Sequence, residues 1–212
     1  MDIKIVLASA SPRRREILEN LGFDIEIITT NAEEGVDISG MAPEVAVQEL
    51  ALVKGRSVAQ KLQNDGDKRY LVVSADTVVV IDGEILGKPK NREEAGCMLK
   101  KLSGRRHSVR TGIAIWKVNG GSTAGKGCAV CEVTDVYFKE LSDDMIEAYL
   151  DTHEYRDKAG SYGIQGKGAY LVDRIEGEYF NVVGFPINKF YELLAEEHKV
   201  DIFHPGLSSL WI

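Results

Sequence analysis

Three consecutive arginines, at positions 13–15, follow a Ser-Pro pair close to the N-terminus. Ser11 is a favourable N-cap and Pro12 suits the first helical position, so the arginines are predicted to lie in the first turn of a helix. That end of a helix carries partial positive charge, and a cation there is unfavourable by about 0.3–1 kcal/mol. Backbone N–H groups, the helix dipole and the arginines would together bind phosphate. We therefore favour an anion site over a solvated basic turn in which an arginine pairs with Glu16 or Glu19.

The carboxylate of Asp76 stands between two apolar segments that are predicted to be strands, at residues 70–74 and 78–81. Inside a strand, a carboxylate costs desolvation energy unless it is paired, hydrogen-bonded or bound to a metal ion. An aspartate at a strand end can instead use its side chain to cap a turn. The residue types alone leave both interpretations open.

Four glycines occur within nine residues, at positions 160, 163, 166 and 168, in a segment that also holds Tyr162, Ile164 and Gln165. Glycines allow backbone conformations closed to other residues and a close approach to a ligand. The embedded aromatic, aliphatic and amide side chains are unlike a simple linker. We therefore favour a binding loop over a flexible surface loop for this glycine-rich loop (residues 157–168).

Four further charged residues are ambiguous by type alone. Lys54 is expected on a helix and Lys88 directly after a hairpin, and lysines are usually surface groups. The acidic pair Glu33 and Glu34 falls in a polar loop, where most such pairs are solvated.

Strands and helices alternate through the first half of the chain, which favours an α/β fold. A nearly continuous apolar run at residues 3–8 is typical of a buried strand. We expect one α/β unit with a mixed sheet. The expected strands are residues 3–8, 24–29, 70–74, 78–81, 106–118 and 128–138, with two more around a turn at 176–177, and the expected helices are residues 12–21, 43–62, 92–103 and 142–151, with one after residue 186.

The composition is that of an ordinary globular protein, with 212 residues of which 44 % are hydrophobic and 28 % charged. Its 26 basic and 33 acidic residues give a formal charge of −7, which disfavours nucleic acid as a partner. There is no run of 18 apolar residues and no signal-peptide pattern, so neither a membrane span nor secretion is expected. Three cysteines argue for a reducing compartment. We expect a cytoplasmic protein.

Several common catalytic and metal-binding patterns are absent or misplaced. Cys128 and Cys131 have CxxC spacing but fall in a predicted strand, where residues three apart point to opposite faces. The chain has no Walker A sequence and no G-x-G-x-x-G that opens a helix after a strand. No serine or cysteine lies in a G-x-S-x-G pattern. A P-loop kinase, a Rossmann dehydrogenase and a hydrolase with a covalent intermediate are therefore disfavoured.

Taken together, these segments resemble the Maf family of nucleoside triphosphate pyrophosphatases. The resemblance runs in order from residue 3 to about residue 195, and several motifs at family-like spacing are far more specific than any one of them. The matching stretches are Leu7-Ala8-Ser9-Ala10-Ser11-Pro12-Arg13-Arg14, Ala75-Asp76-Thr77-Val78-Val79, Gly87-Lys88-Pro89, Leu102-Ser103-Gly104-Arg105 with His107, residues 157–166, and Asn181-Val182-Val183-Gly184-Phe185-Pro186.

The resemblance implies hydrolysis of a nucleoside triphosphate to the monophosphate and pyrophosphate, assisted by Mg²⁺ or Mn²⁺. It implies a single elongated α/β domain over residues 1–199, similar to inosine triphosphate pyrophosphatases, with a central mixed twisted sheet, flanking helices and a cleft between two lobes. Asp76 is implied as the general base and, with Glu34, as a metal ligand. The implied substrate-binding residues are Ser9, Arg13, Arg14, Lys54, Thr77, Lys88 and Gln165.

The resemblance also indicates a substrate branch and partners. Thr77, with Arg13 and Gln165, looks like the branch that acts on dTTP and UTP, and modified pyrimidine triphosphates stay open as substrates. The Gln165 amide could bind the edge of the pyrimidine through paired hydrogen bonds. Family members are commonly dimers, so the resemblance implies a homodimer that binds a nucleoside triphosphate. The composition leads us to expect neither nucleic acid nor a membrane as a partner. The alternative is a nucleotide-sensing regulator of cell division without turnover.

Two residues depart from the family pattern. Gly55 and Ser161 stand where alanine is usual; Gly55 is expected to loosen its helix by about 1 kcal/mol, and Ser161 should be tolerated. Of the acidic pair, Glu34 aligns better. Residues 200–212 have no family counterpart, and their apolar side chains are expected to dock on the domain or at a dimer contact.

Overall fold

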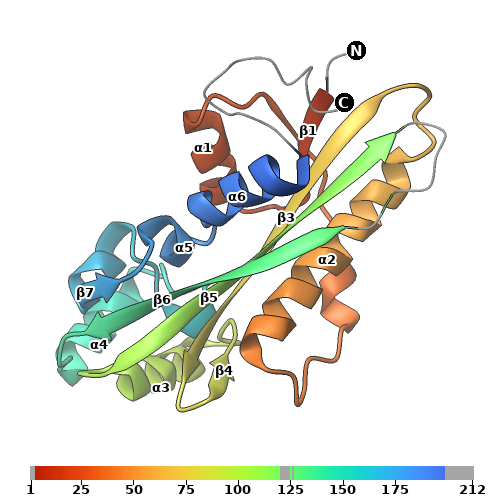
Figure 1. The fold of residues 1–212 in the computed structure, drawn as a ribbon. Coiled ribbons are helices and arrows are strands. Elements are labelled where there is room, and N and C mark those ends of the chain that lie inside the picture. The colour runs from red at the N-terminus through yellow and green to blue at the C-terminus, as the bar shows by residue number, and fades with distance from the viewer. Residues whose placement is uncertain (1–2, 120–124, 126, 199–212) are drawn as a thin grey trace. The chain divides into compact units, whose positions relative to one another are not determined.

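The computed structural model of the chain describes residues 3–119, 125 and 127–198 (Figure 1). Strands and helices alternate over the first half of these residues, as expected. The strands are β1 (Ile3–Leu7), β2 (Ile25–Ile27), β3 (Arg69–Ile81), β4 (Glu84–Leu86), β5 (Arg106–Asn119), β6 (Cys128–Phe138) and β7 (Val172–Glu176). The α-helices are α1 (Pro12–Asn20), α2 (Pro43–Leu62), α3 (Arg92–Leu102), α4 (Asp143–Asp151), α5 (Tyr179–Val183) and α6 (Ile187–His198), and the 3-10 helices are η1 (Ala32–Gly35), η2 (Ala159–Ser161) and η3 (Gly166–Leu171).

The strands form one mixed sheet in the hydrogen-bonding order β2-β1-β3-β5-β6-β7, and β4 pairs with β3 beside this path. β1 is parallel to both its neighbours, with Ile5 opposite Ile25 in β2 and Leu71 in β3. The β3–β4 and β6–β7 pairs are antiparallel. An interior parallel strand is covered on both faces, which explains the nearly continuous apolar run of β1. The expected mixed α/β fold is confirmed.

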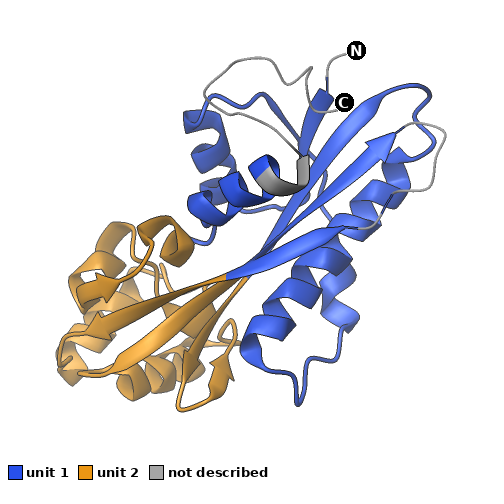
Figure 2. Ribbon diagram, in the orientation of Figure 1, with its two compact units in different colours: residues 1–76, 112–131, 184–212 blue, residues 77–111, 132–183 orange. Residues whose placement is uncertain are grey.

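Two compact units divide the chain (Figure 2). Unit 1 comprises residues 1–76, 112–131 and 184–212, and unit 2 comprises residues 77–111 and 132–183. The chain passes from one unit to the other within strands β3, β5 and β6 and at the end of α5. The residues predicted to bind phosphate and metal thereby fall mostly in unit 1, and those predicted to bind the base fall in unit 2.

The core of unit 1 forms where α2 packs against the strands. Along α2, the buried residues recur every three or four positions, as expected of a helix with one buried face. The helix begins and ends at the residues that its sequence predicts. The core residues are Val6, Ala8, Val58, Ala59, Leu62, Tyr70, Val72, Trp116 and Val118.

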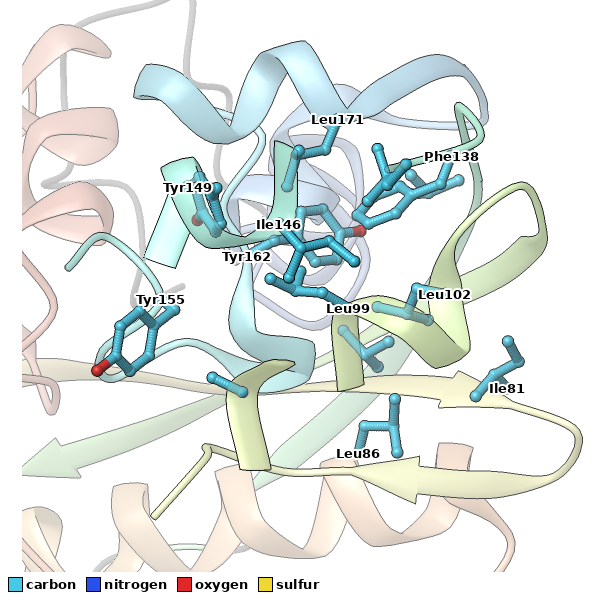
Figure 3. Packing of buried hydrophobic residues seen from close by; sticks show 14 of the residues in the cluster. Ile81, Leu86, Leu99, Leu102, Phe138, Ile146, Tyr149, Tyr155, Tyr162 and Leu171 are labelled. Carbon is cyan, nitrogen blue, oxygen red and sulfur yellow. The ribbon is translucent and has the colours of Figure 1, made fainter. Parts of the chain in front are cut away.

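The core of unit 2 forms between its strands and helices α3 and α4, which contact each other. Leu99, Ile146 and Tyr162 lie together in this core (Figure 3). The Tyr162 ring also packs edge to face with the rings of His107 and Phe138, with centroids 5.4 and 4.6 Å away. Tyr162 comes from the glycine-rich loop, so one residue of that loop is an integral part of the core.

Local signals placed several element ends correctly. The Asn91 side chain accepts the N–H of Glu94 at 2.8 Å and so caps α3. Ser142 caps α4 in the same way, by accepting the N–H of Met145. Asp82 and Gly83, both with positive φ, form the two-residue turn between β3 and β4.

Two expectations about strands were wrong. Residues 70–74 and 78–81 are not separate strands, because β3 continues through Asp76 without interruption. The second strand expected after the turn at 176–177 is the helix α5. Gly177, with φ 128°, ends β7, and the chain then turns into the helix.

Some expectations concern residues outside the described ranges. These are most of the turn at 119–121 and the tail at 200–212. Among the helices that the structure describes, none is long and apolar enough to cross a membrane.

Candidate active site

Serine hydroxyls hold the start of α1, directly after β1. The Ser11 side chain accepts the N–H of Arg14 at 3.5 Å, and the Ser9 side chain accepts the N–H of Ser11 at 3.2 Å. The first turn of α1 contains no acidic residue. The predicted helix start is confirmed, with its arginines at the positive end of the helix dipole.

Arg13 and Arg15 have different surroundings. Arg15 is exposed and forms an ion pair with Glu19 at 2.7 Å, one helical turn away. This is the solvated pairing that stood as the alternative to an anion site, and it accounts for Arg15. Arg13 is half-buried, and within the described residues it has neither a hydrogen-bond nor an ion-pair partner. Its guanidinium therefore remains available for an anion.

Arg14 is buried and ties α1 to two other segments. Its Nε donates to the carbonyl of Gly184 at 2.8 Å, and its Nη1 donates to the carbonyl of Ala75 at 2.7 Å and to Ser9 Oγ at 3.2 Å. Burial lowers the pKa of Arg14, and the negative charge of Asp76 acts in the opposite direction. The guanidinium thus anchors the arginine-bearing turn to β3.

The ammonium of Lys54 lies between two carboxylates. Its Nζ is 2.6 Å from Asp76 Oδ1 and 2.9 Å from Glu33 Oε1. The three side chains are only 11 %, 18 % and 25 % exposed, for Lys54, Asp76 and Glu33 respectively. Charges shielded from water to this extent interact more strongly than surface pairs. The structure thereby brings together two of the predicted site residues, Lys54 and Asp76, and explains how β3 tolerates a carboxylate.

A buried hydroxyl fixes α2 against β3 next to this charged group. Ser74 Oγ donates to the carbonyl of Ala51 at 2.7 Å. Ser74 and Asp76 are two residues apart in a strand, so their side chains project from the same face. Ala51 precedes Lys54 by three residues, which places both on one side of the helix. This contact sets the spacing at which Lys54 meets Asp76.

The acid that reaches Lys54 is Glu33, whereas Glu34 is exposed. Both belong to η1, and adjacent residues of a helix point in different directions. Glu33 Oε2 is buried and has no hydrogen-bond partner among the described residues. A buried carboxylate oxygen without a donor is unfavourable and suits a ligand for a cation.

The donor atoms around Lys54 fit a hard divalent cation. Mg²⁺ typically takes one or two protein carboxylates and completes its shell with phosphate oxygens and water. Glu33 and Asp76 supply such carboxylates. Over the described part of the chain, there is no group of three or more His, Cys, Asp or Glu residues that could hold a metal ion. The remaining ligands of a cation bound here would be phosphate oxygens and water.

In unit 2, a chain of hydroxyl groups holds Thr77. Thr77 Oγ1 lies 3.0 Å from Thr111 Oγ1, and Thr111 donates to the carbonyl of Asn181 at 3.0 Å. A hydroxyl has one proton and a carbonyl only accepts, so Thr77 donates to Thr111. Towards any further partner, Thr77 can then act only as an acceptor.

Lys88 and Gln165, the other predicted site residues of unit 2, are exposed. For neither side chain is a hydrogen-bond or ion-pair partner found within the described residues. Both are thus open to a ligand.

Two buried polar residues that position site residues were not predicted from the sequence. Ser74 and Asn181 lie in or beside the quoted motifs, but their partners come from distant parts of the chain. The Asn181 amide donates to the carbonyl of Val109 at 3.0 Å and to Thr134 Oγ1 at 2.9 Å. The role of Asn181 can be inferred only when it is known that β5 and β6 lie beside it.

Known proteins match the chain over most of its length. Residues 4–197 match the family model described as Maf-like protein. A dTTP/UTP pyrophosphatase from Thermoanaerobacter sp. is 49 % identical over 198 residues, which cover 93 % of this chain and 98 % of that relative. Proteins of the same description from Acetivibrio thermocellus and Pyrococcus furiosus are 51 % identical over 196 residues and 47 % identical over 197 residues, covering 92 % and 93 % of this chain and 95 % and 97 % of those relatives.

Solved structures include a HAM1 protein from Coxiella burnetii, with a TM-score of 0.46 and 17 % identity over 92 % of this chain and 99 % of that one. The family model spans β1 to α6 and includes every predicted site residue. On that match and on the identity to the three relatives, the chain belongs to the Maf family.

Proposed function

We propose that this protein hydrolyses dTTP and UTP to the nucleoside monophosphate and pyrophosphate. Relatives that are 47–51 % identical over nearly their whole length are described as dTTP/UTP pyrophosphatases. The structural observation that carries the proposal is the Lys54 ammonium held between the carboxylates of Asp76 and Glu33. A cation beside partly buried acids suits a reaction in which a polyanion is bound and water loses a proton.

In the proposed reaction, the oxygen of a water molecule bonds to the α-phosphorus of the nucleotide. The bond from that phosphorus to the oxygen bridging the β-phosphate breaks, and its electron pair leaves with pyrophosphate. Asp76, as general base, takes the proton of the water. The negative charge of a triphosphate opposes the attack, so positive groups that neutralise it lower the barrier.

Unit 1 supplies several groups for the phosphates. Arg13 offers a guanidinium at the start of α1, where the dipole and backbone N–H groups also favour an anion. Arg14 adds its charge from a buried position, and Ser9, which contacts Arg14, offers a hydroxyl. Lys54 neutralises charge beside Asp76.

For the metal, we propose that Asp76 and Glu33 hold Mg²⁺ or Mn²⁺ together with the substrate. Glu34, which the family resemblance favoured, is the competing ligand. Once bound, such a cation neutralises phosphate charge and lowers the pKa of the water it coordinates. The unpartnered Glu33 Oε2 supports Glu33 as the ligand.

Thr77, Lys88 and Gln165 belong to unit 2, and one substitution each tests the roles of Lys88 and Gln165. Lys88 offers an exposed ammonium for phosphate, and Lys88→Ala should raise the KM for UTP. The Gln165 amide matches the carbonyl and N3–H of uracil or thymine as donor and acceptor. Gln165→Ala should therefore lower the ratio of UTP to CTP turnover. Thr77 is proposed, from the family resemblance, to help select dTTP and UTP together with Arg13 and Gln165.

The decisive experiment measures pyrophosphate release from UTP with Mg²⁺ in the wild type and in Asp76→Asn. Removing a general base should lower kcat by about 10²- to 10⁴-fold. Asp173→Asn, which changes an exposed carboxylate of β7, is the matched control and should leave turnover unchanged. The proposal would be contradicted if the wild-type protein bound UTP but released no pyrophosphate, as expected of a regulator without turnover.

We also propose, from the family resemblance, that the protein acts as a homodimer in the cytoplasm, with residues 1–199 forming the catalytic region and residues 200–212 lying outside it. The family model ends at residue 197, which agrees with this boundary. Sedimentation of the full chain and of a chain ending at residue 199 tests both points, since a dimer contact through the tail would be lost in the shorter one.

A further inference from the structure

The side chain of Glu154 binds the backbone at the C-terminal end of the glycine-rich loop. Glu154 is half-buried, and its Oε2 accepts the N–H of Lys167 at 3.0 Å and the N–H of Gly168 at 3.4 Å. A carboxylate that accepts two neighbouring backbone N–H groups makes charge-assisted hydrogen bonds, which are stronger than neutral ones. Nothing in the proposed reaction uses this carboxylate.

A glycine in the loop leaves room for that carboxylate. Gly166 has a positive φ of 70°, which a residue with a side chain rarely adopts. A Cβ at this position would lie 2.9 Å from Glu154 Oε2. Glycine at position 166 therefore favours both the backbone conformation and the close approach of Glu154.

The base of the loop is closed by two further contacts. A Cβ on Gly168 would lie 2.1 Å from the carbonyl oxygen of Gly163, so the two backbones touch. The Lys158 ammonium donates to the backbone carbonyl of Glu154, and its stem lies against Gly163. Gln165 is thereby left at the exposed tip of a closed backbone loop, two residues before the first N–H that Glu154 binds.

The beginning of the loop is held by unit 2 as well. The N–H of Gly160 donates to the carbonyl of Gly87 at 3.0 Å, and the Tyr162 hydroxyl lies 2.7 Å from Nε2 of the buried His107. With this end anchored in the core, the position of Gln165 depends on the other end. Among the described residues, Glu154 is the side chain that binds the backbone there.

We propose that Glu154 is a positioning residue: by binding the N–H groups of Lys167 and Gly168, it fixes Gln165 so that the loop prefers uracil and thymine over cytosine. This inference rests on the proposed function in one respect, that a pyrimidine nucleotide is the ligand. A neutral acceptor in the same place should position Gln165 nearly as well, because the carboxylate binds the backbone and not the substrate.

Three variants separate this role from others. Glu154→Ala removes the acceptor, Glu154→Gln keeps one without the charge, and Glu147→Ala removes an exposed carboxylate of α4 as the matched control. The first readout is amide hydrogen exchange at Lys167 and Gly168, which needs no ligand. The second is calorimetric binding of UTP and CTP in the Asp76→Asn background, which needs no turnover.

In Glu154→Ala, exchange at Lys167 and Gly168 should speed up, and the preference for UTP over CTP should fall by up to about tenfold, the effect of losing one typical hydrogen bond to the base. Glu154→Gln should recover most of both properties, and Glu147→Ala should change neither. Because Glu154 acts through Gln165, adding Glu154→Ala to Gln165→Ala should lower the preference no further.

Three results would overturn the proposal: an unchanged UTP preference in Glu154→Ala, a Glu154→Gln variant no better than Glu154→Ala, or additive effects in the double variant. Failure of the proposed function looks different. In that case the wild type releases no pyrophosphate from UTP, while the exchange and binding measurements still decide the role of Glu154.

Discussion

The indole ring of Trp116 occupies the space that a side chain at Gly55 would need. A Cβ built on Gly55 would lie 2.4 Å from Cδ1 and 2.6 Å from Nε1 of the indole, and 2.7 Å from Ser74 Oγ. A Cβ essentially never makes non-bonded contacts this short, so α2 can lie this close to β3 and β5 because position 55 is glycine. The departure from the alanine usual in the family is therefore matched by the tryptophan and does not simply weaken the helix.

Gly55→Ala should destabilise the protein in spite of the better helix propensity of alanine. Overpacking a well-filled core costs about 1–3 kcal/mol, which outweighs the gain from propensity. Urea unfolding should show the loss in the free energy of unfolding. Lys54 directly precedes Gly55 in α2, so a shift of the helix should also weaken its ion pair with Asp76 and reduce pyrophosphate release.

Gly96 of α3 provides the matched control. A Cβ there would meet only Leu150, at an ordinary contact distance of 3.5 Å. Gly96→Ala should thus stabilise the protein by about 0.5–1 kcal/mol. If both variants were stabilised to the same degree, the close approach of Trp116 to Gly55 would not describe the protein.

His107 should make the stability of the protein fall in mild acid. Burial lowers its pKa to about 4, against a smaller opposing effect of the Arg105 backbone. The unfolded chain binds the proton at a pKa near 6.5, so the stabilising effect of the neutral imidazole is complete above that pH and is lost as the pH falls towards 4. Between pH 7.5 and pH 5 this one group should cost about 2 kcal/mol of the free energy of unfolding.

His107→Gln is the control for that pH dependence. Glutamine does not titrate in this range and can still form a hydrogen bond with the Tyr162 hydroxyl. Urea unfolding at pH 7.5 and pH 5 should therefore show a smaller fall for the variant than for the wild type. Equal falls would mean that His107 is not held neutral by burial.

The hydroxyl of Thr111 should contribute more to the free energy of unfolding than its methyl group does. Thr111→Val keeps the shape but removes the donor to the Asn181 carbonyl and the acceptor for Thr77, which should cost about 1–3 kcal/mol. Thr111→Ser keeps both hydrogen bonds and should cost less. Thermal or urea unfolding of the pair checks the order, and a valine variant as stable as the serine variant would contradict it.

Local signals predicted most elements because the physics that sets them is local. Ser11, Asn91 and Ser142 cap helices whichever way the rest of the chain folds, and Asp82-Gly83 turns a hairpin by its own backbone preference. The continuity of β3 could not be predicted in this way. A carboxylate within a strand is tolerated only because α2 brings Lys54 to it, and that contact joins residues 22 positions apart.

The candidate site shows the same limit. The types and order of Arg13, Lys54 and Asp76 carried the family resemblance, but the type of a residue does not tell where its side chain points. Three neighbouring arginines differ in the structure: one is paired with Glu19, one is buried as an anchor, and one is without a partner among the described residues. Glu33 and Glu34 are adjacent and have the same side chain, so the sequence does not tell which of them contacts Lys54. That depends on the backbone path of η1.

Replacing Glu33 and Glu34 one at a time by glutamine tests which of them binds the metal ion. Glu33→Gln removes a charge beside Lys54 and should weaken the apparent affinity for Mg²⁺ by about 10- to 100-fold in pyrophosphate release from UTP, the range typical of groups that support a metal site. Glu34→Gln changes an exposed side chain of the same helix and should leave the affinity unchanged. Circular dichroism and urea unfolding show whether each variant is folded, because Lys54 loses one partner in the first. If Glu34→Gln raised the Mg²⁺ requirement and Glu33→Gln did not, the ligand would be the one that the family resemblance favoured, and the position of Glu33 beside Lys54 would serve only the charge balance of the site.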